Sequence, residues 1–151
     1  MESIFADTNA LIRLLGGDVL VAQLTDEKIV FISEMTEMEL LCKPNQTKEE
    51  KHIITTLLDY CVIVPFSPDI KQRAIKIRLT TRLKLVDSII AATAVGLDIP
   101  IITRDRAFES LSKSLNVILL VWFTKFYNVP FPLLTFYLSG FAIIHAVWNT
   151  K

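Results

Sequence analysis

The sequence predicts an α/β fold, a three-layer sandwich with a mostly parallel central sheet, plus an apolar C-terminal extension. Short apolar segments alternate with amphipathic ones over residues 3–121, which is the order of a β-α-β fold. The apolar segments lack polar alternation, as expected where helices cover both faces of a sheet. Every acidic residue precedes residue 118, and the chain beyond it has only two charged side chains, Lys125 and Lys151. We therefore expect a folded domain at 1–121 and a separate tail at 122–151.

The beginning of the domain follows a strand–helix order. An apolar segment at 3–6 ("SIFA") predicts the first strand. The helix that follows it is stopped by the Gly16-Gly17 pair. A second strand is expected at 28–33 ("KIVFIS"), and the helical segment "TEMELLCK" ends before Pro44 because the residue preceding a proline avoids helical geometry.

The middle of the domain is expected to hold two long helices around a short strand. Thr47 caps the helix "KEEKHIITTLLDYC", whose apolar residues fall on one helical face. The strand is "VIVPF" (62–66). The Ser67-Pro68 pair is a favourable helix start, and "IKQRAIKIRLTTRL" after it has the helical period.

The end of the domain contains an apolar helix and two strands. "DSIIAATAVG" (87–96) predicts a buried helix that stops at Gly96. "IPIITRD" (99–105) is a strand, "RAFESLSK" a short helix, and "NVILLV" (116–121) the last strand.

The tail departs from the composition of the domain. Residues 126–148 carry no charge and could span about 30 Å of hydrocarbon as one helix. Pro130 and Pro132 would interrupt that helix and leave 133–148, which is short for a membrane span. Three interpretations stay open: a membrane-associating hairpin or helix, a buried helix that covers the domain or a dimer seam, and an altered reading frame without a selected function.

Membrane fractionation tests the first interpretation of the tail. If the tail associates with membranes, the full chain partitions with the membrane fraction and a chain of residues 1–121 stays in the supernatant, because only the tail has long uncharged stretches. Equal partition of the two chains would remove the membrane interpretation.

The composition excludes several classes of protein. No basic stretch followed by an apolar stretch opens the chain, so we expect no signal peptide and a cytoplasmic protein, with membrane association only through the tail. Cys42 and Cys61 form no C-x-x-C pair, and we expect both to be reduced core thiols. Four glycines in the whole chain exclude a Gly-rich phosphate loop.

Four acidic residues occupy comparable places, each just after a predicted strand or near the start of a helix. They are Asp7, Glu39, Asp87 and Asp105. Because functional groups in parallel α/β sheets lie beyond the carboxyl ends of the strands, we expect these four to converge. Taken singly, each is more typical of a helix cap, and Thr36-x-x-Glu39 also fits a capping box.

Convergence would favour a metal site. Four carboxylates in one crevice repel one another unless a cation lies among them. Hard divalent ions with oxygen ligands, Mg²⁺ or Mn²⁺, are the natural partners, and a set without His or Cys disfavours zinc. Two such ions about 4 Å apart can activate water and stabilise the leaving oxygen in phosphodiester cleavage.

Four segments, "FADTN", "ISEMTEMELL", "LVDSIIAATA" and "PIITRDRAF", resemble in order the four acidic motifs of the PIN-domain ribonucleases. The closest resemblance is to the VapC-type toxins of bacterial toxin–antitoxin pairs, and it covers about residues 3–121. It places the family's catalytic, metal-binding acids on Asp7, Glu39, Asp87 and Asp105. The implied function is a Mg²⁺-dependent endoribonuclease, with Mn²⁺ as the alternative ion, that hydrolyses RNA phosphodiesters by metal-activated water. The implied partners are the RNA substrate, a cognate antitoxin protein and a second copy in a homodimer.

The same resemblance selects among neighbouring residues. Glu39 keeps the family's Thr-x-x-Glu-Leu frame, whereas Glu37 is rotated by about 200° on a helix and should face away. We interpret Thr8, Asn9 and Thr103 as groups that orient carboxylates or metal-bound water. The alternative is that these three are ordinary turn and cap residues.

Basic residues precede and flank the acidic motifs. Residues 71–84 contain six Lys or Arg and no acid, and they lead directly into Asp87. By itself this run is typical of a solvated helix face, but beside an acidic metal site it could hold RNA phosphates. The residues expected to bind RNA are Arg78, Arg82, Lys84, Arg104 and Arg106.

The sequence also allows two functions other than a nuclease. A phosphoaspartyl phosphatase also has an Asp after its first strand, but it needs a second Asp two residues later, where this chain has Asn9. A catalytically impaired PIN-like module, associated with a membrane through its tail, would bind only RNA or an antitoxin. The presence of all four acids argues against impairment.

Overall fold

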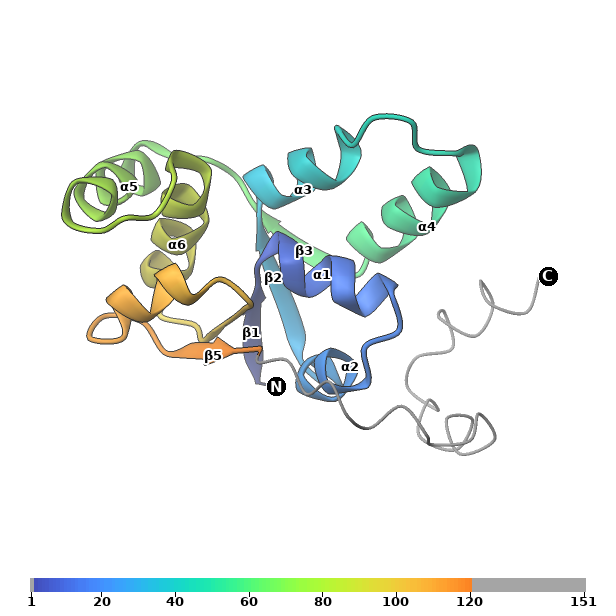
Figure 1. The fold of residues 1–151 in the computed structure, drawn as a ribbon, viewed down its shortest axis with the longest axis horizontal. Helices are drawn as coiled ribbons and strands as arrows, with labels where there is room; N and C mark the ends of the chain where they lie inside the picture. Colours follow the sequence, from blue (N-terminus) through green and yellow to red (C-terminus); the bar gives the residue numbers. More distant parts are fainter. Residues whose placement is uncertain (1, 121–151) are drawn as a thin grey trace. The chain divides into compact units, whose positions relative to one another are not determined.

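The computed structural model describes residues 2–120, and these contain one five-stranded sheet with the order β3-β2-β1-β4-β5 (Figure 1). Its strands are β1 (Ser3–Ala6), β2 (Ile29–Ser33), β3 (Cys61–Val64), β4 (Ile101–Thr103) and β5 (Val117–Leu119). Every strand pair in this sheet is parallel, so the predicted α/β class is confirmed. The predictions made for the tail at 122–151 lie outside the described residues.

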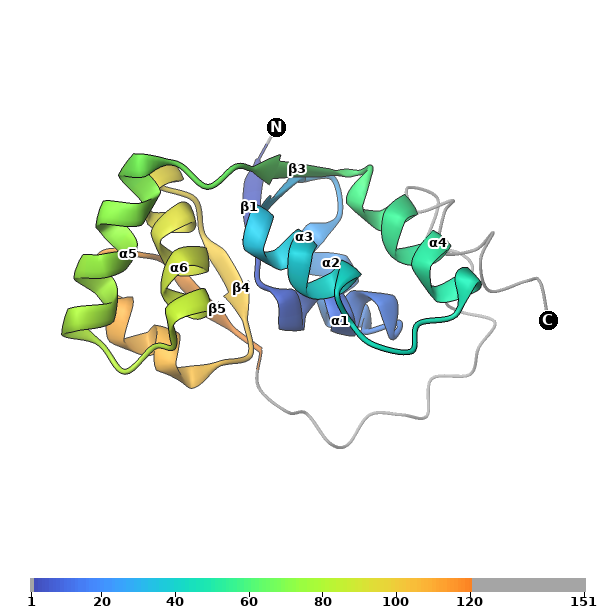
Figure 2. The same cartoon turned by 90° about the horizontal axis from the view of Figure 1, so that it is seen from above.

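Helices of the described chain lie on both sides of the sheet, which gives the three layers that the sequence predicts (Figures 1 and 2). On one side are α5 (Pro68–Thr80) and α6 (Leu85–Leu97). On the other side are α1 (Thr8–Leu15), α2 (Val19–Thr25), α3 (Glu34–Leu41) and α4 (Lys48–Leu58). A 3₁₀ helix, η1 (Arg106–Leu111), precedes β5.

The main core lies between the sheet and the α5–α6 pair. Phe5 of β1 and Phe108 of η1 are completely buried in it, together with Ile90 and Ile101. Because α6 is covered by the sheet on one side and by α5 on the other, its sequence is apolar almost all round, as expected for a helix without a solvent face. This packing fixes the position of the first turn of α6, which carries Asp87.

The strand order makes β1 the topological switch point of the sheet. The chain passes from β1 to β2 on one side and later places β4 on the other side of β1, so the direction of winding reverses at β1. In open parallel sheets, ligands bind at such a switch point, beyond the carboxyl ends of the strands. Asp7 follows β1 and Asp105 follows β4, and the fold therefore directs both residues to this edge.

Several local predictions are corrected by the structure. The sequence pattern assigned no element to residues 18–27, but Asp18 accepts from two backbone amides and starts α2. The helix α6 passes through Gly96 and ends at Leu97, and its C-cap residue Asp98 takes the left-handed conformation with φ 55°. The predicted short helix after β4 is the 3₁₀ helix η1. The capping box at Thr47 is confirmed, with both of its reciprocal hydrogen bonds formed.

The two cysteines differ in exposure. Cys61 is partly buried, and burial raises the pKa of its thiol to about 11. Cys42 is exposed at the C-terminal end of α3, so the prediction of two core thiols is wrong for this residue. Within residues 2–120 no helix combines the length and the apolar character that a bilayer crossing requires.

Candidate functional site

The register of the sheet places a buried hydroxyl beside Asp7. Ala6 of β1 pairs with Ile102 of β4, and the Asp7 amide donates to the Ile102 carbonyl. The next residues of the two strands, Asp7 and Thr103, therefore lie beside each other. The Thr103 hydroxyl donates to Asp7 Oδ2 at 2.6 Å and accepts from the Asp105 amide at 3.0 Å. Asp7 and Thr103 are both buried. Thr103 therefore joins the carboxylate after β1 to the backbone after β4.

The second acid, Glu39, is held by the residue next to Asp7. Ser33 caps α3 by accepting from the Met35 amide, and the helix then carries Glu39 toward the start of α1. The Thr8 hydroxyl donates to Glu39 Oε2 at 2.5 Å. The consecutive residues Asp7 and Thr8 thus bring acids from β1 and α3 together.

Asp87 joins this group from the first turn of α6. Its pKa is raised by burial, and further by the charges of Asp105 and Glu39, while nearby Lys84 lowers it. The pKa of Asp7 is raised to about 6, chiefly because burial disfavours the charged form. The Thr103 hydrogen bond opposes that rise, and the charge of Asp87 adds to it. Asp87 therefore interacts electrostatically with each of the other three predicted acids.

The capping alternative applies to only part of this set. Asp105 does cap η1, because its Oδ1 accepts from the Ala107 amide at 2.8 Å. Asp7 occupies the N-cap position of α1 but makes no side-chain capping hydrogen bond there. Glu39 is not part of a capping box, since α3 is capped by Ser33 rather than Thr36. Helix capping consequently does not explain the convergence of the four acids.

The raised pKa of Asp7 predicts how the stability of the metal-free protein depends on pH. Between about pH 4 and pH 6 the folded protein keeps a proton on Asp7 that the unfolded chain has lost. The free energy of unfolding should therefore lose up to about 3 kcal/mol through this group as the pH rises across that interval.

Carbon-13 NMR of the Asp7 carboxyl in EDTA, with urea unfolding at each pH, measures this effect. We expect a titration midpoint near 6. A midpoint near the ordinary pKa of aspartate would contradict the claim that burial raises the pKa of Asp7.

The donor set fits a hard divalent ion. All four groups are carboxylates, which are the ligands that Mg²⁺ and Mn²⁺ prefer. Residues 2–120 contain no group of three or more His, Cys, Asp or Glu side chains already spaced to hold a metal ion. Mg²⁺ commonly keeps several waters and binds through one or two carboxylates together with substrate phosphates, so its binding does not require three protein ligands in direct contact.

The remaining predicted residues differ in how they lie. Thr8 and Thr103 hold carboxylates, as described, and their part in catalysis stays a prediction. The Asn9 side chain is exposed and forms no hydrogen bond with another side chain in the described chain, although its backbone amide helps to lower the pKa of Asp7. Sequence reasoning gave no role to Ser33, although a serine directly after a strand and before a helical segment is a typical N-cap signal.

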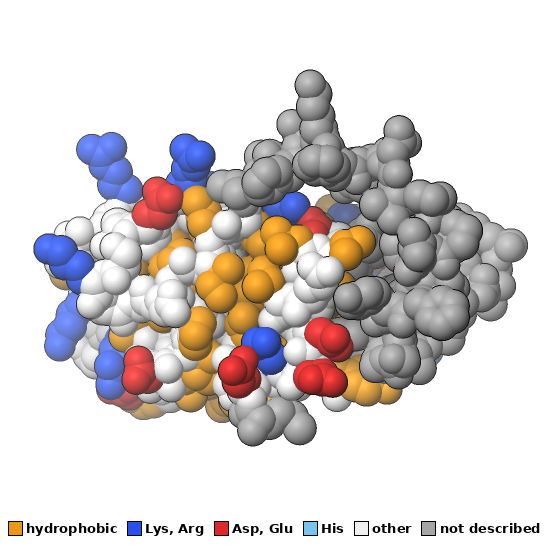
Figure 3. All heavy atoms as spheres, turned by 90° about the horizontal axis from the view of Figure 1, so that it is seen from below, with side chains coloured by type: hydrophobic (Ala, Val, Ile, Leu, Met, Phe, Trp, Pro, Cys, Tyr) orange, Lys and Arg blue, Asp and Glu red, His pale blue; other side chains and the backbone are white. Residues whose placement is uncertain are grey.

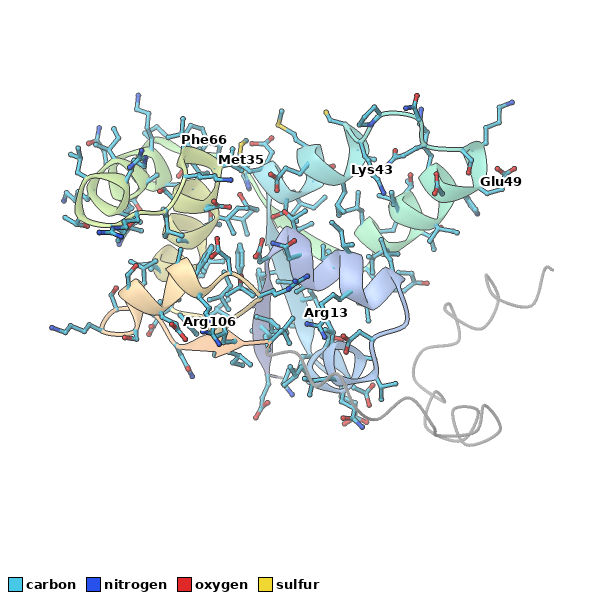
Figure 4. All side chains as sticks on the ribbon, viewed as in Figure 1. Arg13, Met35, Lys43, Glu49, Phe66 and Arg106 are labelled. Carbon is cyan, nitrogen blue, oxygen red and sulfur yellow. The ribbon has the colours of Figure 1, made fainter. Side chains whose placement is uncertain are left out.

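The predicted RNA-binding residues are all exposed. They are Arg78, Arg82, Lys84, Arg104 and Arg106. Lys84 is the N-cap residue of α6 and lies near enough to Asp87 to affect its pKa. Arg106 is labelled at the start of η1 in Figure 4. In the view from below, Figure 3 shows Lys and Arg side chains toward the end of the molecule formed by α5, while hydrophobic side chains gather over the middle.

Comparisons with known proteins identify the fold. The sequence profile of the PIN domain matches residues 4–114. A toxin–antitoxin complex from Klebsiella pneumoniae contains a chain that is 28% identical, with a TM-score of 0.64; the match covers 77% of this chain and 96% of that one. The comparison with curated proteins gives no match.

Two further solved structures share the fold at lower identity. VapBC-1 from nontypeable Haemophilus influenzae is 18% identical with a TM-score of 0.66, and the match covers 77% of this chain and 96% of that one. DNA-bound VapBC from Salmonella typhimurium is 17% identical, also with a TM-score of 0.66, with 78% and 98% covered. These identities show the fold alone. With most of its length matched by the family profile, the chain belongs to the PIN domain family.

Proposed function

We propose that this protein is a Mg²⁺-dependent endoribonuclease that acts as the toxin of a toxin–antitoxin module. One observation carries the proposal: Asp87 interacts with Asp7, Glu39 and Asp105, and the charges of these neighbours add to the raised pKa of Asp7 and of Asp87. Such a group of carboxylates costs stability in the metal-free protein and gains from a divalent cation. The proposed catalytic and metal-binding residues are Asp7, Glu39, Asp87 and Asp105.

The protein's own groups orient these acids. Thr103 occupies one oxygen of Asp7, Thr8 occupies one oxygen of Glu39, and the Ala107 amide occupies one oxygen of Asp105. Because the two oxygens of a carboxylate offer about four acceptor positions, these hydrogen bonds leave each group able to bind a cation as well. When bound, Mg²⁺ or Mn²⁺ would supply an activated water at neutral pH and stabilise charge on the leaving oxygen.

RNA binding is assigned to the exposed basic residues. Lys84 lies beside Asp87, and Arg104 and Arg106 flank Asp105 in the chain. Cations at the border of an acidic site offset its repulsion of RNA and hold phosphates in place. Arg78 in the last turn of α5 and Arg82 in the loop after it are also exposed, and we assign them the same role.

An antitoxin partner and a homodimer complete the proposal. The solved structures from Klebsiella pneumoniae and Salmonella typhimurium are described as a toxin–antitoxin complex and as DNA-bound VapBC. By analogy, we propose that an antitoxin protein binds this chain and blocks the site formed by the four acids. The opposing candidate is a PIN-like module that binds RNA or antitoxin without cutting, and it is favoured by the lack of a preformed three-ligand metal cluster within residues 2–120.

Metal removal and return distinguishes the two functions. The purified full chain should cleave RNA in Mg²⁺, lose all cleavage in excess EDTA, and recover it when Mg²⁺ or Mn²⁺ is added back, because the carboxylates bind the water-activating ion. RNA binding without cleavage under every condition would support the binding module. Cleavage that continues in EDTA would contradict the proposed mechanism.

A further inference from the structure

The buried hydroxyl of Thr36 is directed to the site rather than to its own helix. Thr36 lies in the first turn of α3 and is completely buried. Other buried helical threonines, Thr25 and Thr93, donate to a carbonyl of their own helix. Within residues 2–120 the one hydrogen-bond partner of the Thr36 hydroxyl is the hydroxyl of Thr8, with the two oxygens 3.4 Å apart.

We propose that Thr36 is a positioning residue for Glu39 and acts through Thr8, an inference that rests on the proposed function, in which Glu39 binds the cation. The Thr8 hydroxyl has one proton, and it goes to Glu39 Oε2 at 2.5 Å because a hydrogen bond to a carboxylate is the stronger one. The single proton of Thr8 cannot serve both contacts, so the contact of 3.4 Å forms a hydrogen bond only with the Thr36 hydroxyl as donor and the Thr8 oxygen as acceptor. Hydrogen bonds in such a chain polarise and strengthen one another.

The hydrogen-bonded hydroxyls of Thr36 and Thr8 restrict the side chain of Glu39 to one position. Glu39 is exposed, and a long exposed side chain samples several rotamers unless a partner holds it. Thr36 and Glu39 are three residues apart on α3 and so lie on the same side of the helix. Thr8 follows Asp7 directly. Thr36 therefore sets the position of Glu39 relative to Asp7 from a buried and rigid base.

Removal of the Thr36 hydroxyl tests this role. Thr36→Val keeps the shape of the side chain and Thr36→Ser keeps the hydroxyl. Thr93→Val is a matched control at a buried threonine whose hydroxyl, within residues 2–120, donates to the Ile89 carbonyl of its own helix. Mn²⁺ affinity of the full chain, measured by electron paramagnetic resonance, should fall roughly tenfold in Thr36→Val and stay near wild type in the other two. The kcat for RNA should fall by a similar factor, with KM changed less than about twofold. Wild-type affinity and kcat in Thr36→Val would overturn the proposal.

The route through Thr8 is tested by a double-mutant cycle. If Thr36 acts through Thr8, Thr36→Val has no further effect on Mn²⁺ affinity once Thr8→Val is present, whereas full additivity would overturn that route. If Thr36→Val fails to fold, Thr36→Ala compared with Thr36→Ser gives the same contrast.

The outcome for Thr36 can be separated from the outcome for the proposed function. A folded wild type that neither binds Mn²⁺ nor cleaves RNA overturns the function. Thr36 is then tested in the metal-free protein by the carbon-13 shift of the Glu39 carboxyl at fixed pH. We expect this shift to move in Thr36→Val and not in Thr93→Val, and an unmoved shift overturns the positioning role.

Discussion

Replacement of Asp7 by asparagine is expected to abolish RNA cleavage and, at the same time, to stabilise the metal-free fold. Activity should fall by at least about 100-fold, which corresponds to about 2.7 kcal/mol of lost transition-state stabilisation, because the amide cannot bind the cation as a carboxylate does. Growth arrest on expression should disappear with it. The substitution also removes a buried charge whose pKa is raised to about 6, so the free energy of unfolding in EDTA at pH 7.5 should rise by up to about 3 kcal/mol.

The combination of these two results excludes unfolding as the cause of inactivity. Thr103 can still donate to the amide oxygen of the new side chain, so the fold has no reason to open at this point. Asp59→Asn is a matched control at an exposed aspartate at the end of α4, and it should leave both activity and stability near wild type. RNA cleavage assays and urea unfolding of the same preparations measure both quantities. An Asp7→Asn variant that still cleaves RNA at the wild-type rate would contradict the assignment.

Glu39→Gln is expected to reduce cleavage at least about tenfold, whereas Glu37→Gln should change it by less than about twofold. Glu39 accepts from Thr8 and contributes to the raised pKa of Asp87. Glu37 lies on the same helix but forms no hydrogen bond or ion pair within residues 2–120. The two substitutions make the same chemical change two residues apart, so each is the control for the other.

The kinetic constants for RNA cleavage, measured for both variants at saturating Mg²⁺, decide between the two glutamates. The reverse order of effects would show that the wrong glutamate was assigned to the site. Glu34, the third glutamate of α3, accepts a hydrogen bond of 2.8 Å from the Phe66 amide. It therefore holds the loop between β3 and α5.

Most of the fold could be predicted because its signals are local. Each strand is indicated by a short apolar segment without polar alternation. Two helix starts are indicated by single local signals, the cap at Thr47 and the Ser67-Pro68 pair. The short helix α2 was missed because seven residues give little periodicity, and Gly96 was misread because packing of α6 against α5 outweighs the cost of one glycine near a helix end.

The arrangement of the site could be predicted only in part. Spacing after strands identified the four acids, since the carboxyl ends of parallel strands share one edge. Asp7 lies beside Thr103 because β1 lies between β2 and β4 in the sheet. No local sequence pattern encodes that strand order. The same holds for Thr36, whose motif position was visible in the sequence but whose contact with Thr8 joins residues 28 positions apart.

Mn²⁺ binding to the metal-free full chain tests most directly whether the four acids form the cation site of a nuclease. Electron paramagnetic resonance should detect binding to the wild type, at least tenfold weaker binding to Asp87→Asn, and unchanged binding to Asp59→Asn, because Asp87 lies within the electrostatic reach of Asp7, Glu39 and Asp105. Mn²⁺ that binds Asp87→Asn as tightly as the wild type, or does not bind the wild type at all, would contradict this account.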